Sequence, residues 1–154
     1  GSFVFGSVSV NGKLSGDNSV IVKYDTSGNA LWTKTFTSAS GEYCLGSISV
    51  DASGNVYSAG CINGIGAFAF GDVSITGKFN GYNAIIVKYD ASGNVLWFKT
   101  LASASNSSSF GSITVDTSGN VYAAGTISGT GAFKFDSVSV TGKFNDYEAV
   151  IVKY

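Results

Sequence analysis

The sequence predicts an all-β protein built from a repeated unit of four-stranded antiparallel sheet. The segment Asp-x-Ser-Gly-Asn occurs four times, starting at Asp25, Asp51, Asp90 and Asp116. The first and third copies are 65 residues apart, as are the second and fourth, so a two-hairpin unit repeats with that period. The chain also has no Pro, few charged residues and many Val, Thr and Tyr residues, a composition typical of strands.

Each Asp-x-Ser-Gly-Asn copy is predicted to be a hairpin turn. An Asp side chain can accept hydrogen bonds from the backbone two residues on, and Gly adopts a positive φ without steric cost. The alternative is a calcium loop, which is disfavoured because calcium takes about six to eight oxygen ligands and each copy has one Asp. The predicted structural turn residues are Asp25, Gly28, Asn29, Asp51, Gly54, Asn55, Asp90, Gly93, Asn94, Asp116, Gly119 and Asn120.

The first residues of the chain already follow the repeat. Phe5 aligns with Phe70 and Phe135 at the 65-residue spacing. Val20–Tyr24 and Ala84–Tyr89 are predicted to be strands covered on both faces, because their residues are largely apolar on both sides. The Asp25 turn then leads into the segment that contains Trp32.

Two further hairpins are predicted in the middle of the chain, each closed by one of the turns. They pair Ser47–Val50 with Val56–Gly60, and Ala84–Tyr89 with Val95–Leu101. Phe68–Ile75 is predicted to be a short fifth strand. Four main strands in each repeat follow from this pattern.

Side-chain sizes indicate how the sheets pack. Tyr57–Gly60 and Ala123–Gly125 carry mostly small residues, which let neighbouring sheets approach closely, whereas Trp32 and Trp97 are bulky. Sheets that are narrow at one end and wide at the other fit a radial, β-propeller-like arrangement. The two Trp side chains are expected to pack between sheets rather than to form ligand platforms, and each buried indole N–H then needs a partner.

The pattern FGDVSITGKFNGYNAIIVKYDASGNVLWFKT, followed by SITVDTSGNVYAAG, resembles the bacterial β-propeller repeat family called SBBP. The resemblance covers the whole chain and implies propeller blades whose innermost strand begins each Val-Asp hairpin. It implies that residues 1–36 hold the outer strands of a partial blade, 37–101 a complete blade, and 102–154 a blade that lacks its last strand. The chain would then be a partial array of blades.

The sequence departs from the SBBP pattern just before one strand of each repeat. Asn18-Ser19, Asn83 and Glu148 stand at the equivalent positions, where the family often has an acidic residue. Any role that the family assigns to this acid is therefore not carried over to the chain as a whole.

Cys44 and Cys61 are the only cysteines, and they flank the Asp51 turn at nearly equal distances. Antiparallel pairing through this turn brings them to opposing or adjacent positions. A disulfide between them is predicted, in keeping with an oxidising compartment, and two buried free thiols are the alternative. Zinc binding is not expected, because two Cys without any His leave the ligand set incomplete.

Composition argues against several classes of function. The chain has no His, so the commonest general base is absent, and its net charge of −1 gives no basic surface for nucleic acid. Its apolar runs are far shorter than the roughly 20 residues needed to span a bilayer, so no membrane insertion is expected. Asp136, Asp146 and Glu148 are close in sequence but do not indicate a catalytic carboxylate pair. We therefore expect no enzyme activity, no cofactor and no metal site.

The function expected from these observations is a non-catalytic segment, extracellular or on the cell surface, that acts as a structural scaffold, adhesin or surface filament component. Its expected partners are further copies of the repeat, in the same chain or in neighbouring subunits, because unprotected strand edges associate readily. One alternative is a propeller that binds glycans, other ligands or cell-surface proteins through loops such as Ser38–Tyr43 and Ala102–Phe110. Another is the non-catalytic part of a larger secreted enzyme. Asn106-Ser107-Ser108 also matches a glycosylation sequon.

Overall fold

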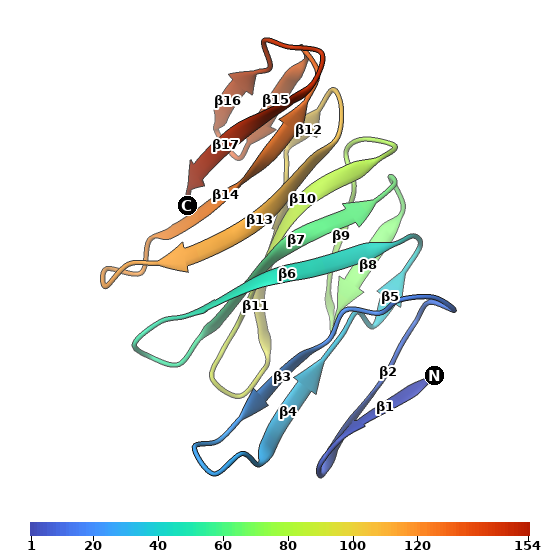
Figure 1. The fold of residues 1–154 in the computed structure, drawn as a ribbon, viewed down its shortest axis with the longest axis vertical. Coiled ribbons are helices and arrows are strands. Elements are labelled where there is room, and N and C mark those ends of the chain that lie inside the picture. Colours follow the sequence, from blue (N-terminus) through green and yellow to red (C-terminus); the bar gives the residue numbers. More distant parts are fainter.

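A computed structural model describes residues 1–154, and all of its regular elements are β-strands (Figure 1). This confirms the all-β prediction. No helix is present that could cross a membrane. The strands are β1 (Ser2–Phe5), β2 (Val8–Asn11), β3 (Ile21–Tyr24), β4 (Ala30–Lys34), β5 (Ser38–Ala39), β6 (Tyr43–Val50), β7 (Val56–Asn63), β8 (Ala67–Phe70), β9 (Val73–Thr76), β10 (Tyr82–Tyr89), β11 (Val95–Thr100), β12 (Ser103–Ala104), β13 (Ser108–Val115), β14 (Val121–Ser128), β15 (Ala132–Phe135), β16 (Val138–Thr141) and β17 (Tyr147–Lys153).

The strands form six antiparallel sheets that follow one another along the long axis of the molecule, from β1–β4 at one end to β15–β17 at the other (Figure 1). The central sheet has the order β11-β10-β7-β6, and the terminal sheet has the order β13-β14-β17. Two side sheets, β5-β8-β9 and β12-β15-β16, flank them, and the pairs β1-β2 and β3-β4 complete the chain. The sheets do not close into a barrel or a propeller.

The two predicted middle hairpins are confirmed. In the β6–β7 hairpin Ser47 lies opposite Ala59, and in the β10–β11 hairpin Ile85 lies opposite Thr100. The prediction of one short strand over Phe68–Ile75 was wrong, because this segment forms the two strands β8 and β9. The chain reverses between them at Gly71, whose φ of +56° is a conformation that glycine adopts without strain.

The four Asp-x-Ser-Gly-Asn segments are hairpin turns, as predicted, and each Asp carboxylate organises its own turn. The Ser53 and Asn55 N–H groups both donate to Asp51 Oδ1 at 2.9 Å, and Asn55 Nδ2 donates to Asp51 Oδ2 at 2.8 Å. Gly54 has a φ of +79°. The same bonds recur at Asp25, Asp90 and Asp116. Both oxygens of every turn carboxylate are therefore engaged within the turn.

A second set of local hydrogen bonds, which the sequence analysis did not predict, holds the loop before β10 in place. Asn83 Oδ1 accepts the N–H groups of Lys78 and Phe79 at 2.7 and 2.8 Å. Its Nδ2 group donates to the carbonyls of Phe79, Gly81 and Gly64. Asn83 therefore has a structural role in this loop.

Asn18 and Glu148, which stand 65 residues before and after Asn83, accept backbone N–H groups in the same way. Asn18 Oδ1 accepts the N–H groups of Lys13 and Leu14, and Glu148 Oε1 accepts those of Lys143 and Phe144. An amide and a carboxylate can both make this contact, because each presents an oxygen acceptor. Only Asn can also donate to the loop carbonyls.

The core lies on both faces of the central sheet, because the middle strand β10 is apolar on each side. Ala84 and Ile86 are buried against the terminal sheet, while Ile85 and Val87 are buried on the opposite face. The prediction that this strand is covered on both faces is therefore confirmed. Tyr24, at the end of the equivalent strand β3, is instead exposed.

The opposite face of the central sheet packs against an aromatic cluster. The Phe36 ring centroid lies 4.0 Å from that of Phe70, and Phe70 contacts Phe98 edge-on at 5.4 Å. Trp32 is buried beside this cluster, and its indole N–H donates to the Ala91 carbonyl at 3.1 Å. The expectation that Trp32 packs between sheets and finds a partner is confirmed.

Candidate binding cleft

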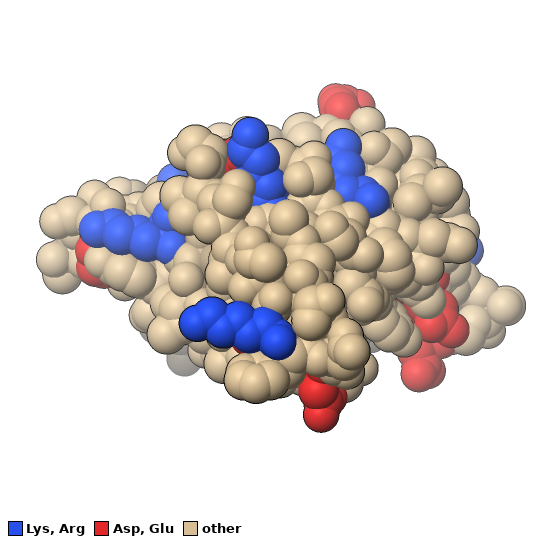
Figure 2. Space-filling model, turned by 90° about the horizontal axis from the view of Figure 1, so that it is seen from above, with Lys and Arg blue, Asp and Glu red and all other residues tan.

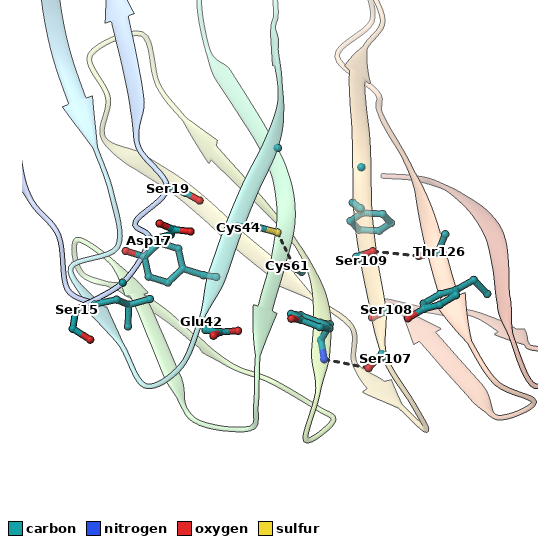
Figure 3. A pocket seen from close by; sticks show the side chains of 18 residues that line it. Ser15, Asp17, Ser19, Glu42, Cys44, Cys61, Ser107, Ser108, Ser109 and Thr126 are labelled. Carbon is teal, nitrogen blue, oxygen red and sulfur yellow. Dashed lines mark hydrogen bonds between the residues drawn. The ribbon is translucent and has the colours of Figure 1, made fainter. Parts of the chain in front are cut away.

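A cleft of about 1130 Å³ lies between three segments that are distant in the sequence (Figure 3). One wall is the loop Leu14–Ser19, the second is the start of β6 with the end of β7, and the third is the start of β13. The stacking of the central and terminal sheets brings the last two walls together. The cleft therefore depends on tertiary structure, and no single motif in the sequence marks it.

Cys44 and Cys61 lie side by side in the wall formed by β6 and β7 (Figure 3). They are directly opposite each other in the strand register, as the turn spacing indicated. The predicted disulfide is not formed, because both are free cysteines and their sulfur atoms are 2.7 Å apart, longer than an S–S bond of about 2.05 Å. The two sulfurs instead share a hydrogen bond.

This contact makes the two thiols chemically different. The hydrogen bond from Cys61 lowers the pKa of Cys44 from 9.0 to about 6, against the opposing effect of partial burial. The hydrogen bond that Cys61 donates, together with its burial, raises the pKa of Cys61. Cys44 is exposed at the cleft and Cys61 is buried, so the thiol with the lowered pKa is also the accessible one.

The wall formed by β13, together with Thr126 of β14, carries hydroxyl groups where the wall formed by β6 and β7 has sulfur. Ser109 and Thr126 stand 65 residues after Cys44 and Cys61, and their hydroxyls are 3.2 Å apart in the same cross-strand position. Ser108 Oγ accepts the N–H of Ala84, which links β13 to β10. Part of the hydroxyl lining therefore holds the two sheets together.

Aromatic rings and two carboxylates complete the lining. Tyr82 and Tyr147 are exposed at the cleft, and Asp17 and Glu42 are its only charged residues. Exposed Tyr rings beside hydroxyl and carboxylate acceptors can stack on the apolar face of a neutral polar ligand and hydrogen-bond its hydroxyls.

The loops that the sequence suggested for ligand binding reach the cleft only in part. Glu42 and Tyr43 from the first loop, and Ser107–Phe110 from the second, line it. The beginnings of the same loops form β5 and β12, which pair with the side sheets. Asn106 of the sequon is half-buried and its Oδ1 accepts the N–H of Ser107.

The remaining acidic candidates do not gather at one place. Asp136 forms an ion pair with Lys99, Asp146 Oδ1 accepts the N–H of Tyr147, and Glu148 is engaged in its loop. Charged side chains lie singly among uncharged atoms on the face shown in Figure 2. No three His, Cys, Asp or Glu side chains are grouped so that they could hold a metal ion.

Comparisons with known proteins give no family for this chain. Neither the protein-family models nor the curated proteins contain a match to it.

Proposed function

We propose that this chain is a non-catalytic, extracellular segment of β-propeller-type blades that serves as a structural scaffold, adhesin or surface filament component. Its 65-residue units would each supply one blade, and stacking of blades would build the scaffold. Further copies of the unit are the partners that this function requires.

The observation that carries the proposal is the packing of the central sheet against the terminal sheet. Tyr57 and Ile86 on one sheet are buried in a single hydrophobic cluster with Ile113 and Val121 on the other. The Ile113 N–H also donates to Ser47 Oγ across the junction at 3.1 Å. Sheet stacking of this kind buries apolar surface that neither sheet could bury alone, which is how repeat proteins gain stability.

Surface labelling tests the proposed location and role. Antibodies raised against residues 1–154 are applied to intact cells that carry the native gene, with a cytosolic protein as the control for leakage. Labelling of intact cells, removed by brief external protease treatment, supports the proposal. Labelling that appears only after the cells are permeabilised contradicts it.

The cleft favours one alternative function, the binding of a glycan. Its exposed Tyr rings and hydroxyl groups suit a sugar, whose ring has apolar faces and a polar rim. A glycan array compares the wild-type chain with the Tyr82→Ala variant, and with Tyr24→Ala as a control at an exposed Tyr outside the cleft. Selective binding that only Tyr82→Ala abolishes would establish this alternative, and no binding would exclude the glycans on the array.

A further inference from the structure

The outer edge of β17 has no strand paired with it. β17 pairs with β14 along its other edge only. Its segment Ala149–Tyr154 differs from Ala84–Tyr89 of β10 at one position, Val150 in place of Ile85. β10 carries β11 along the corresponding edge, and β3, which has a similar sequence, carries β4. The β17 edge is thus the third copy of an edge that is occupied in the other two.

The strands that occupy these edges share a sequence pattern and a register. β4 reads Ala-Leu-Trp-Thr-Lys, and β11 begins Val-Leu-Trp-Phe-Lys. Trp32 lies opposite Lys23 in the first pair, and Trp97 lies opposite Lys88 in the second. The same register on β17 would place a Trp side chain opposite Lys153.

The side chains that contact this Trp in the central sheet are repeated in the terminal sheet. Trp97 packs edge-on against Tyr57 at 6.0 Å, and Lys88 Nζ lies 4.8 Å from the centroid of the same Tyr ring. In the terminal sheet Lys153 Nζ lies 5.3 Å from the centroid of Tyr122. Tyr122 and Lys153, the aromatic contact site, are therefore already arranged as their counterparts are, without a Trp beside them.

Apolar residues around this edge are exposed where their counterparts are buried. Ile86 is 1% exposed, whereas Ile151, at the equivalent position, is 76% exposed. Ala84 is likewise buried and Ala149 exposed. Phe144 and Tyr147 extend the exposed apolar surface at the start of β17. In the central sheet the terminal sheet covers Ala84 and Ile86, so the exposed face beside β17 is a surface for another apolar sheet, and the open backbone edge of β17 is what fits an added strand.

We propose that the outer edge of β17 and the aromatic contact site bind an extended segment of the pattern apolar-Leu-Trp-x-Lys by strand addition. The repeat itself carries this pattern, so another copy of the repeat is the source of the segment. The incoming strand pairs antiparallel with residues 150–154, and its Trp packs against Tyr122 opposite Lys153. This inference rests on the proposed scaffold function. It identifies the contact between successive units as pairing of the β17 edge with the Trp-containing strand of the next copy.

A synthetic peptide with the sequence of residues 90–101 tests the proposal. The peptide carries fluorescein at its N-terminus, and its anisotropy is titrated with the 154-residue chain. Saturable binding is expected, with slower hydrogen exchange in β17 and unchanged exchange in β1. A peptide carrying Trp97→Ala should bind at least about tenfold more weakly, because a buried aromatic anchor dominates such contacts.

Protein variants locate the binding surface. Tyr122→Ala and Ile151→Lys should each weaken peptide binding, whereas Ile48→Lys, which places the same charge at an exposed Ile outside this edge, should leave it unchanged. Circular dichroism checks that each variant is folded. The Trp97→Ala peptide needs no protein variant, so the proposal stays testable if Tyr122→Ala does not fold.

Three results would overturn the proposal. They are equal binding of the Trp97→Ala peptide, protection from exchange outside β17, and a dimer in light scattering that shields β17 and that the peptide does not dissociate. Surface labelling of cells does not depend on this edge. A failed titration with positive labelling would therefore reject the strand-addition contact alone, and the reverse pair of results would reject the scaffold function.

Discussion

Replacing Asn83 with alanine should destabilise the fold, because this side chain at the start of β10 holds the loop before the strand. Asn83 is completely buried and its side chain makes five hydrogen bonds to the backbone. Alanine leaves the N–H groups of Lys78 and Phe79 without a protein acceptor. It also removes the donor to three carbonyls, each of which keeps a second lone pair for another partner.

The size of the loss follows from these groups. A buried donor left without an acceptor costs about 1–3 kcal/mol. Lys78 is exposed, so water can satisfy its N–H, while Phe79 is half-buried. We therefore expect Asn83→Ala to lower the free energy of unfolding by about 2–4 kcal/mol, a large part of the roughly 5–15 kcal/mol that stabilises a typical domain. Asn83→Asp keeps the oxygen acceptor but turns a second acceptor toward the carbonyls of Phe79, Gly81 and Gly64, so it should not restore the lost stability.

Urea unfolding, followed by Trp fluorescence, measures the change as a shift in midpoint at constant slope. Glu148→Ala is the matched control, because it removes the same acceptor contact in a loop where Lys143 and Phe144 are exposed. Its loss should stay below about 1 kcal/mol, since water replaces the carboxylate. The reasoning fails if Asn83→Ala destabilises the chain no more than Glu148→Ala does.

Three further predictions concern single residues. Gly60→Ala should strongly destabilise the β6–β7 hairpin, because an added Cβ would lie 1.8 Å from the Cys44 carbonyl oxygen. Gly46→Ala is the control, because a Cβ at Gly46 would have no atom within 4 Å. Thermal melts of the two variants should show a much larger loss for Gly60→Ala. The Asn94 side chain lowers the pKa of Asp90 below its ordinary value of 3.8. The stability from this turn is therefore fully present above about pH 3.8 and is lost as the pH falls through the folded-state pKa. Asp90→Asn should reduce the fall in urea midpoint between about pH 6 and pH 3, and an unchanged fall would contradict the assignment. Since the pKa of Cys44 is about 6, iodoacetamide at pH 7 should modify it well before Cys61, and peptide mass mapping that finds the reverse order would refute this.

The turns show how much of the fold is local. Asp51, Gly54 and Asn55 form their hydrogen bonds within one short segment, so residue type and spacing were enough to predict the turn and the pairing of β6 with β7. The opposing positions of Cys44 and Cys61 followed from the same turn. The state of the two sulfurs did not, because it depends on a separation of tenths of an ångström that no spacing in the sequence specifies.

Other features could not be predicted because they depend on contacts between distant segments. The cleft needs the Leu14–Ser19 loop, β6 and β13 to meet, and these walls are placed by the stacking of sheets. The β8–β9 hairpin, by contrast, is local, and it was missed although Gly71-Asp72 in the middle of Phe68–Ile75 is a turn signal.

The 65-residue period could be read from the spacing of the repeated motifs, and the turns and the strands beside them could be predicted because each depends on a few neighbouring residues. Only the tertiary structure decided which of the equivalent surfaces are covered. Ile86 and Ile151 stand in nearly identical sequences, yet one is buried and the other exposed. The physical reason is that burial of a strand is provided by the neighbouring sheet. The terminal sheet covers Ile86, and no strand of the structure covers Ile151.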